Sequence, residues 1–195
     1  MDRGCVPCLH YITPVENLPS IARYGLLCHE LADRVVHRSV ALESVQDIRA
    51  HRRVPNALKL HQYVNLYIHA RNSMMFYLKA NSCPPLVVVK VSSSVLDIDG
   101  AVIADGNAAA DTTRFYRSPE GLVALNEGLV FARSWNHPEF WEKQERKRVR
   151  SAEVLVPYRI PVEYVMGVVA ETPPAYAFVN SLGLVGEVNP DVFFR

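Results

Sequence analysis

The sequence predicts an α+β fold, because helical and strand patterns interleave irregularly and several strands alternate between apolar and polar residues. The clearest alternation runs over Tyr63–His69, where Val64, Leu66 and Ile68 share one face. Such alternation is typical of antiparallel strands, whereas a doubly wound α/β fold needs regular strand–helix repeats. The chain has 195 residues, of which 49% are hydrophobic, so we expect one domain over residues 1–195 with a single core.

The first helix is expected at Leu18–Tyr24. Pro19 lacks the N–H that later helical turns need, so the cap of this helix must be Glu16 or Asn17. Gly25 is suited to end the helix. A strand precedes it, and the end of a strand beside a helix N-terminus readily binds anions or polar ligands. Four polar residues lie at this place: His10, Tyr11, Thr13 and Asn17.

A second helix is predicted at Ala41–Arg53, bounded by Pro55. Helical spacing predicts that its inward face carries Leu42, Val45 and Ile48. The opposite face then carries Gln46, Arg49 and Arg53, and arginines in such positions are usually solvated.

The remaining elements follow from apolar runs and their caps. Strands are expected at Leu9–Thr13, Leu86–Val91, Ala101–Ala104, Gly128–Ala132, Val154–Val156 and Tyr164–Val169. Helices are expected at Met74–Lys79, after Ser118-Pro119, from Asn136 or His137 into a basic cluster, and at Pro174–Leu182, with Val192–Phe194 as a terminal strand or docked tail.

The segment Glu142–Pro157 changes abruptly from dense positive charge to a short apolar strand, with Glu153 at the junction. A strand can hold such a carboxylate rigidly while the basic residues attract a phosphate or another polyanion. The alternative is a solvated helical face followed by a surface glutamate. The basic residues are Lys143, Arg146, Lys147, Arg148 and Arg150.

Several functional classes lack support in the sequence. It contains no phosphate-cradling glycine motif, nucleophile elbow or H-E-x-x-H pattern. Cys5 and Cys8 form one C-x-x-C pair without a second, so we expect no metal site and reduced thiols. No apolar run approaches the ~20 residues of a membrane span and no signal pattern opens the chain, so we expect a cytoplasmic protein. With a net charge of +1, any nucleic-acid surface must be local.

Five ordered blocks together resemble the DarT family of DNA ADP-ribosyltransferases, the toxins of DarT–DarG toxin–antitoxin systems. They are HYITPVENLPSIARYGLL, VQDIRAHRRVP, YVNLYIHARNSMMFY, VIADGNAAADTTRFY and KRVRSAEVLVP, and the resemblance covers about residues 9–170. It implies an ADP-ribosyltransferase-like fold in which two small packed sheets form a cleft for NAD+. It also implies transfer of ADP-ribose to a base in single-stranded DNA, with a DarG-like macrodomain antitoxin as a partner and the chain itself as a monomer.

The resemblance also implies roles for individual residues. The catalytic glutamate falls on Glu153, and the catalytic arginine on Arg49. The residues implied for NAD+ binding are His10, Tyr11, Thr13, Asn17, Leu26, Gln46 and Tyr67. At the position where many family members have histidine this chain has Tyr11, with His10 one residue earlier, so either side chain is a candidate for the ribose contact. The residues implied for DNA binding are Tyr116, Lys143, Arg146, Lys147, Arg148 and Arg150.

The chemistry agrees with these roles. Cleavage of NAD+ at its glycosidic bond develops positive charge on the ribose, and a fixed carboxylate at Glu153 would stabilise that charge. The very high pKa of arginine favours electrostatic positioning by Arg49 over general-base work. Exposed aromatics such as Tyr116, Phe140 or Trp141 could stack on unpaired bases. Thymine is the base favoured by the resemblance; guanine, RNA, a protein acceptor and a non-catalytic nucleic-acid-binding module are the alternatives.

Overall fold

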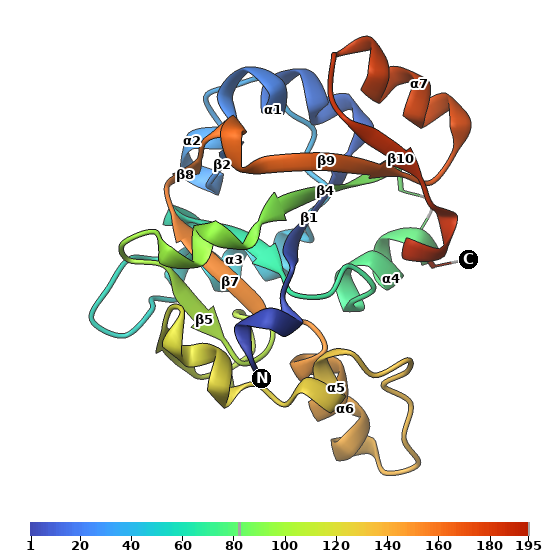
Figure 1. Ribbon diagram of the computed structural model, residues 1–195. Coiled ribbons are helices and arrows are strands. Elements are labelled where there is room, and N and C mark those ends of the chain that lie inside the picture. The colour runs from blue at the N-terminus through green and yellow to red at the C-terminus, as the bar shows by residue number, and fades with distance from the viewer. Residues whose placement is uncertain (82, 195) are drawn as a thin grey trace.

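The computed structural model describes residues 1–81 and 83–194, and its elements are drawn in Figure 1. The strands are β1 (Cys8–Pro14), β2 (Leu26–Leu27), β3 (Tyr63–Tyr67), β4 (Leu86–Ser92), β5 (Val102–Ala104), β6 (Phe115–Arg117), β7 (Glu153–Pro157), β8 (Arg159–Ile160), β9 (Val165–Ala170) and β10 (Gly186–Val188). The helices are α1 (Leu18–Tyr24), α2 (His29–Ala32), α3 (Glu43–His51), α4 (Ser73–Ala80), α5 (Glu127–Val130), α6 (Phe140–Val149) and α7 (Pro173–Ser181).

The main sheet has the strand order β10-β9-β4-β1-β3-β7-β5-β6, and β2 pairs separately with β8. All neighbours in the main sheet are antiparallel except β9 and β10, which are parallel. β1 pairs with β4 from Cys8 to Pro14, yet it meets β3 only at His10 and Tyr67. The α+β class is therefore confirmed, and the two predicted sheets appear as two four-stranded halves of one sheet that touch at one residue pair.

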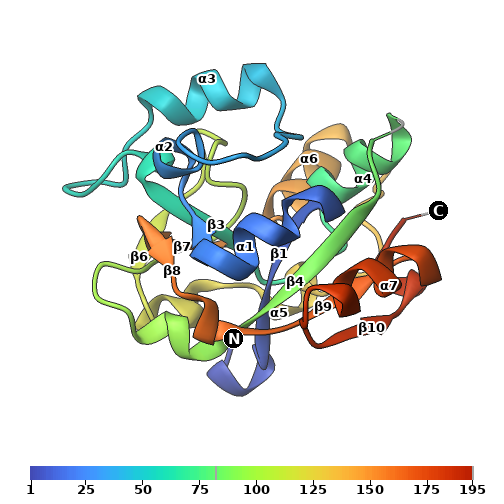
Figure 2. The ribbon, with the colours of Figure 1, turned by 90° about the horizontal axis from the view of Figure 1, so that it is seen from above.

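The core lies on both faces of the half of the sheet that contains β4. β4 is buried on both faces, which explains its uninterrupted apolar sequence. Leu18 of α1 and Val179 of α7 pack into the larger cluster, whereas Met75 of α4 and Phe193 of the C-terminal tail pack into a second one. The docked tail is thus confirmed. Seen from above, α3 and α7 lie on opposite sides of the molecule (Figure 2).

Predictions of elements from the sequence were correct where a capping residue, a proline or a glycine marks the end of the element. α1 begins and ends as predicted, with Gly25 at its C-terminus at a φ of 74°, a conformation that glycine adopts without strain. The helix predicted at Met74–Lys79 is α4, and it follows Asn72, whose side chain accepts the Met75 N–H at 3.0 Å.

One predicted strand was wrong, and one strand was not predicted. Gly128–Ala132 is not a strand; Gly128 lies in α5, because the Asn126 side chain accepts the Leu129 N–H and caps a helical turn there. Tyr116 lies on the edge strand β6, for which the sequence predicted no strand.

The predicted inward face of the second helix was also wrong. In α3, Ile48 is 48% exposed and the preceding Leu42 is 38% exposed, whereas Arg49 is only 7% exposed. The reason is that α3 covers a pocket and not the apolar core, so the buried side chain is the one with an ionic partner.

Among residues 1–81 and 83–194, no helix combines the length and the apolar character needed to cross a membrane. The same residues contain no group of three or more His, Cys, Asp or Glu side chains placed to hold a metal ion.

Candidate active site

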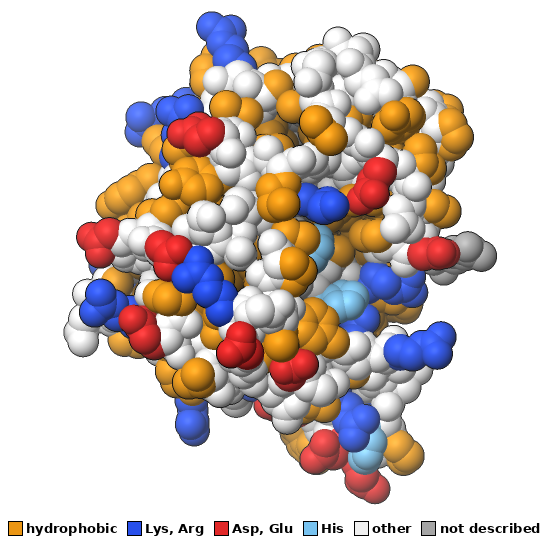
Figure 3. Space-filling model, viewed as in Figure 1, with side chains coloured by type: hydrophobic (Ala, Val, Ile, Leu, Met, Phe, Trp, Pro, Cys, Tyr) orange, Lys and Arg blue, Asp and Glu red, His pale blue; other side chains and the backbone are white. Residues whose placement is uncertain are grey.

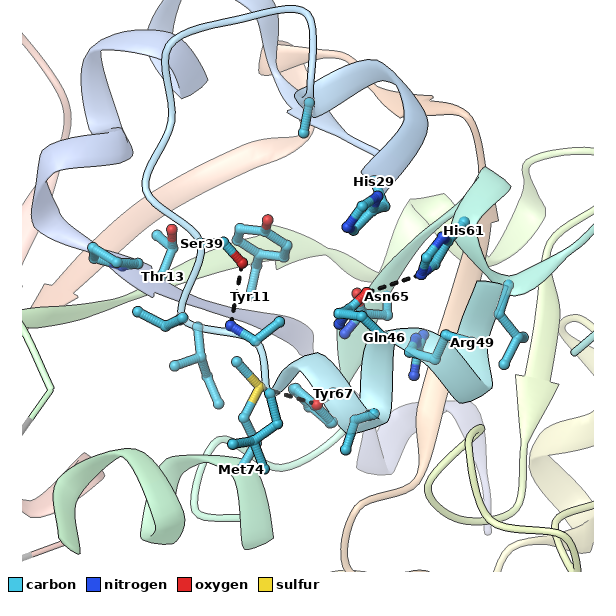
Figure 4. Close-up of a pocket in the computed structure, with 18 of the residues that line it drawn as sticks. Tyr11, Thr13, His29, Ser39, Gln46, Arg49, His61, Asn65, Tyr67 and Met74 are labelled. Carbon is cyan, nitrogen blue, oxygen red and sulfur yellow. Dashed lines mark hydrogen bonds between the residues drawn. The ribbon is translucent and has the colours of Figure 1, made fainter. Parts of the chain in front are cut away.

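A pocket of about 360 Å³ opens where the two halves of the sheet separate (Figure 4). β1 contributes Tyr11 and Thr13 to its wall, and β3 contributes Asn65 and Tyr67. Further lining residues come from α3, the 3₁₀ turn at Leu60–Gln62, the start of α4, and α2 with the connection that follows it. A pocket of this size, with apolar walls and a few converging polar groups, is typical of a small-molecule site.

Glu153 lies beside this pocket as the first residue of β7 and is 0% exposed. Arg49 reaches it from α3 with both terminal nitrogens, Nη2 to Oε2 at 3.1 Å and Nη1 to Oε1 at 3.4 Å. The Ala108 N–H donates to Oε1 at 2.9 Å. The carboxylate is therefore held from two sides, and its position is fixed before any ligand arrives.

Burial by itself lowers the pKa of Arg49, but the Glu153 carboxylate outweighs that effect and the pKa is raised. Arg49 is thus a permanent cation. Tyr67 pairs with Glu153 across β3 and β7, and burial followed by the nearby carboxylate raises the pKa of its phenol. Its hydroxyl donates to the Met74 sulfur at 3.2 Å, so Tyr67 remains a neutral phenol at the pocket wall.

Two histidines that the sequence did not single out for this site stack in the pocket. The rings of His29, from α2, and His61 are nearly parallel, with an angle of 7° and 4.1 Å between centroids. His61 Nε2 donates to Gln46 Oε1 at 2.9 Å. Burial, then His29 and Arg49, lower the pKa of His61, which favours the neutral ring. The two residues lie on separate elements, so no spacing rule could have paired them.

Five of the seven predicted NAD+ residues line the pocket: Tyr11, Thr13, Asn17, Gln46 and Tyr67. His10 does not line the pocket. Its ring lies instead near the Tyr67 carbonyl, at 3.3 Å, and the Cys8 sulfur, at 3.8 Å. Leu26 is buried where β2 pairs with β8, and Leu27 lines the pocket in its place.

Comparison with known proteins identifies the family of this chain. The profile of the family described as ssDNA thymidine ADP-ribosyltransferase, DarT, matches residues 10–194. The chain belongs to the DarT family. It is therefore a DNA ADP-ribosyltransferase by family, and NAD+ is the co-substrate of that family.

Relatives of this DarT-family chain include a DNA ADP-ribosyl transferase of Mycobacterium tuberculosis, 32% identical over 172 residues, which cover 80% of this chain and 72% of the relative. A fusion of a DNA ADP-ribosyl transferase with a DNA ADP-ribosyl glycohydrolase from Thermosipho africanus is 30% identical over 168 residues, which cover 82% of this chain. The match covers 41% of the fusion protein, so the chain spans less than half of that relative.

Solved structures show the same fold. Thermus sp. 2.9 DarT in complex with ADP-ribosylated ssDNA matches with a TM-score of 0.83 at 21% identity, over 97% of each chain. The same protein in complex with NAD+ matches with a TM-score of 0.77 at 19% identity, over 97% of this chain and 98% of that one.

The residues predicted for DNA binding in this DarT-family chain do not all face solvent. Lys143 and Lys147 on α6 are exposed, and Lys147 also lines the pocket. Arg146 is half-buried. Arg148 pairs with Asp105 and with Glu145, each at 2.7 Å.

Arg150 and Tyr116 are less available for DNA binding than the α6 lysines. Arg150 is 2% exposed, and its Nε donates to the Arg71 carbonyl at 2.7 Å. Tyr116 packs against the main core and lines a separate pocket with Phe115. The exposed cations of α6 are therefore the lysines, and Arg148 and Arg150 have structural contacts instead.

Proposed function

We propose that this protein transfers ADP-ribose from NAD+ to a thymine base in single-stranded DNA, with Glu153 and Arg49 as its catalytic residues. The observation that carries the proposal is the buried Arg49–Glu153 pair, whose arginine lines a pocket of about 360 Å³, in a chain of the DarT family. Thymine follows from the description of the family, and guanine remains the alternative that the experiment below tests.

The reaction breaks the bond between the ribose and nicotinamide, and its electron pair leaves with nicotinamide. Positive charge develops on the ribose, and the Glu153 carboxylate, held by Arg49 and the Ala108 N–H, stabilises that charge through a ribose hydroxyl. The acceptor nitrogen of the base then bonds to the ribose carbon and loses its proton. Because Arg49 and the Ala108 N–H already hold the carboxylate, its orientation is set before the reaction begins.

Single-stranded DNA is proposed to reach the pocket along α6. Phe140, Lys143 and Lys147 recur at helical spacing on this helix, and Lys147 lies at the pocket itself. The aromatic rings of Phe140 and Trp141 are 60% and 80% exposed and meet edge to face at 5.3 Å between centroids. Lysines then contact phosphates while the aromatic pair stacks on an unpaired base, the combination that single strands require.

A macrodomain antitoxin of the DarG type is the proposed partner, and the protein is proposed to act as a toxin. The support is the Thermosipho africanus relative, which joins a DNA ADP-ribosyl transferase to a DNA ADP-ribosyl glycohydrolase in one chain. An enzyme that removes the DNA modification opposes one that adds it. An activity test of that antagonism needs only the modified oligonucleotide and a glycohydrolase of this class.

The test of the function is mass spectrometry of single-stranded oligonucleotides incubated with NAD+ and either the protein or Glu153→Gln. The expected result is a gain of one ADP-ribose on thymine-containing DNA, and at least ~10²-fold slower modification by Glu153→Gln. Oligonucleotides without thymine, RNA of the same sequence and protein acceptors are incubated in parallel. A gain on guanine, RNA or protein alone replaces the proposed acceptor, and no gain on any acceptor supports a non-catalytic binding module.

A further inference from the structure

The connection between α2 and α3 crosses one side of the pocket, and residues 37–42 all line it. We call residues 37–42 the strap. It contains no helix or strand, so its position depends on the side chains that hold it. These side chains come from the 3₁₀ turn at Val15–Asn17 and from α1.

Asn17 makes the most complete of these contacts. Its Oδ1 accepts the Arg38 N–H at 2.7 Å, and its Nδ2 donates to the Arg38 carbonyl at 2.9 Å. The second Nδ2 hydrogen is directed to Thr13 Oγ1, also at 2.9 Å. Asn17 is 9% exposed, so these bonds form away from most of the solvent.

Two further contacts hold the strap region more weakly. Arg38 Nη1 pairs with Glu16 Oε1 at 2.9 Å, but both side chains are half exposed to solvent, where ion pairs contribute little. The Ser20 hydroxyl donates to the carbonyl of Val36, just before the strap. Asn17 is the buried member of the set, and a buried polar contact is costly to break.

We propose that Asn17 is a positioning residue that latches the strap over the pocket, and that it favours NAD+ binding through the strap without touching NAD+. Both donors and the acceptor of its amide are occupied by Thr13 and Arg38, so little hydrogen-bonding capacity remains for a ligand. The role toward NAD+ rests on the proposed function, whereas the latching of the strap does not.

The first arm of the test needs no ligand. Arg38 makes the strap a trypsin site, and a protease needs the chain around its target bond to be locally released. In the absence of NAD+, Asn17→Ala is expected to be cut after Arg38 about tenfold faster than the wild-type protein, with the fragments identified by mass spectrometry. Glu16→Gln is the matched control, because it removes only the exposed contact to the same residue, and its cleavage rate is expected to stay within about twofold.

The second arm measures NAD+. Asn17→Ala is expected to raise both the Kd for NAD+, measured by calorimetry, and KM by about tenfold, with kcat within about threefold of the wild-type value. Asn17→Asp keeps the acceptor for the Arg38 N–H but loses both donated bonds, so its cleavage rate and Kd are expected between those of the wild type and Asn17→Ala. If Asn17→Ala does not fold, the cleavage rate and Kd of Asn17→Asp are measured in its place.

The outcomes separate the latch from the proposed function. An unchanged cleavage rate of the ligand-free variants with weakened NAD+ binding would mean that Asn17 contacts NAD+ directly, and it overturns the latch. Faster cleavage with unchanged Kd overturns the link between strap and co-substrate. A wild-type protein without transferase activity contradicts the proposed function, while the cleavage arm still decides whether Asn17 holds the strap.

Discussion

At the scale of single residues, Arg49 and Glu153 depend on each other for charge compensation, because they are only 7% and 0% exposed. Removal of one partner from a buried pair leaves an uncompensated charge, a change that costs about 3–5 kcal/mol. We therefore expect Arg49→Met to lower the free energy of unfolding by about 3 kcal/mol, since Glu153 then keeps only the Ala108 N–H. Urea denaturation monitored by circular dichroism measures this change.

The double variant Arg49→Met/Glu153→Gln is the control for that prediction. It removes both charges, so a substantial part of the lost stability is expected to return. If Arg49→Met were as stable as the wild type, the pair would not be the main compensation for the buried carboxylate.

His69 provides a pH-dependent prediction at the same scale. Its Nδ1 accepts the Arg71 N–H at 3.0 Å, and burial, followed by Arg150, lowers its pKa to about 4. Between pH 6.5 and about 4 the unfolded chain binds a proton that the folded protein does not bind at this site. Stability from this residue is therefore complete above pH 6.5 and falls as the pH is lowered through that window.

His69→Asn can keep an acceptor near Nδ1 but cannot titrate. We expect its free energy of unfolding to decline less between pH 7 and pH 5 than that of the wild type, as measured by urea denaturation at each pH. His51→Asn, which changes an exposed histidine of α3, is the control. An equal decline in the wild type and His69→Asn would show that the folded protein protonates His69 as readily as the unfolded chain does.

At the scale of elements, α3 is unusual because Arg49 is its buried residue and no apolar side chain anchors it to the core. Arg52, which follows the helix, donates to the Asp111 carboxylate at 3.2 Å and to the Thr113 carbonyl at 3.4 Å. The loop that contains these residues also supplies the Ala108 N–H to Glu153. Arg52 therefore joins the helix that carries Arg49 to the loop that holds Glu153.

Loss of that connection should affect the reaction more than the fold. We expect Arg52→Ala to lower kcat about tenfold, because Arg49 and Glu153 are no longer held in one geometry, while KM for NAD+ changes less. Steady-state kinetics with a modified oligonucleotide as the readout measure this. Arg53→Ala, one residue further and exposed, is expected to keep kcat; an equal loss in both variants would mean that any charge change at this end of α3 is harmful.

The elements also show where sequence reasoning succeeds. α1 was predictable because Pro19 and Gly25 act locally on the backbone. The inward face of α3 was not, because the burial of Arg49 depends on Glu153, far along the chain, and helical spacing alone selects apolar residues such as Ile48. The strand predicted at Gly128–Ala132 was wrong for a different reason. A short apolar run is compatible with a strand or a helix, and here the Asn126 cap makes it the helix Glu127–Val130.

At the scale of the whole molecule, the pocket exists because β1 and β3 separate after a single residue pair. This separation brings Tyr11 from one half of the sheet to the same wall as Tyr67 from the other. The family resemblance singles out Glu153 and Arg49, since each falls within a recognisable block, and the two side chains lie in contact. The Ala108 N–H and the His29–His61 stack could not, because their positions follow from the way separate elements fold together.

The charge of the whole molecule leads to the last prediction. The net charge is only +1, so attraction to DNA must come from a local surface, and we propose the exposed lysines of α6 as that surface. Figure 3 shows Lys and Arg side chains interspersed with Asp and Glu over the visible face. Each phosphate contact contributes about 0.7 to the slope of log K against log salt for single strands. We expect Lys143→Ala and Lys147→Ala each to weaken oligonucleotide binding and to reduce that slope by about 0.7, as measured by fluorescence anisotropy from 50 to 300 mM NaCl.

Arg23→Ala is the matched control, because Arg23 is an exposed cation on α1, at the other end of the molecule from α6 (Figure 1). It changes the net charge by the same amount, so a general charge effect would reduce binding equally in all three variants. A slope that falls only in the α6 variants locates the phosphate contacts on that helix. Unchanged slopes in Lys143→Ala and Lys147→Ala would instead move the DNA path away from α6, and the exposed rings of Phe140 and Trp141 would then need another explanation.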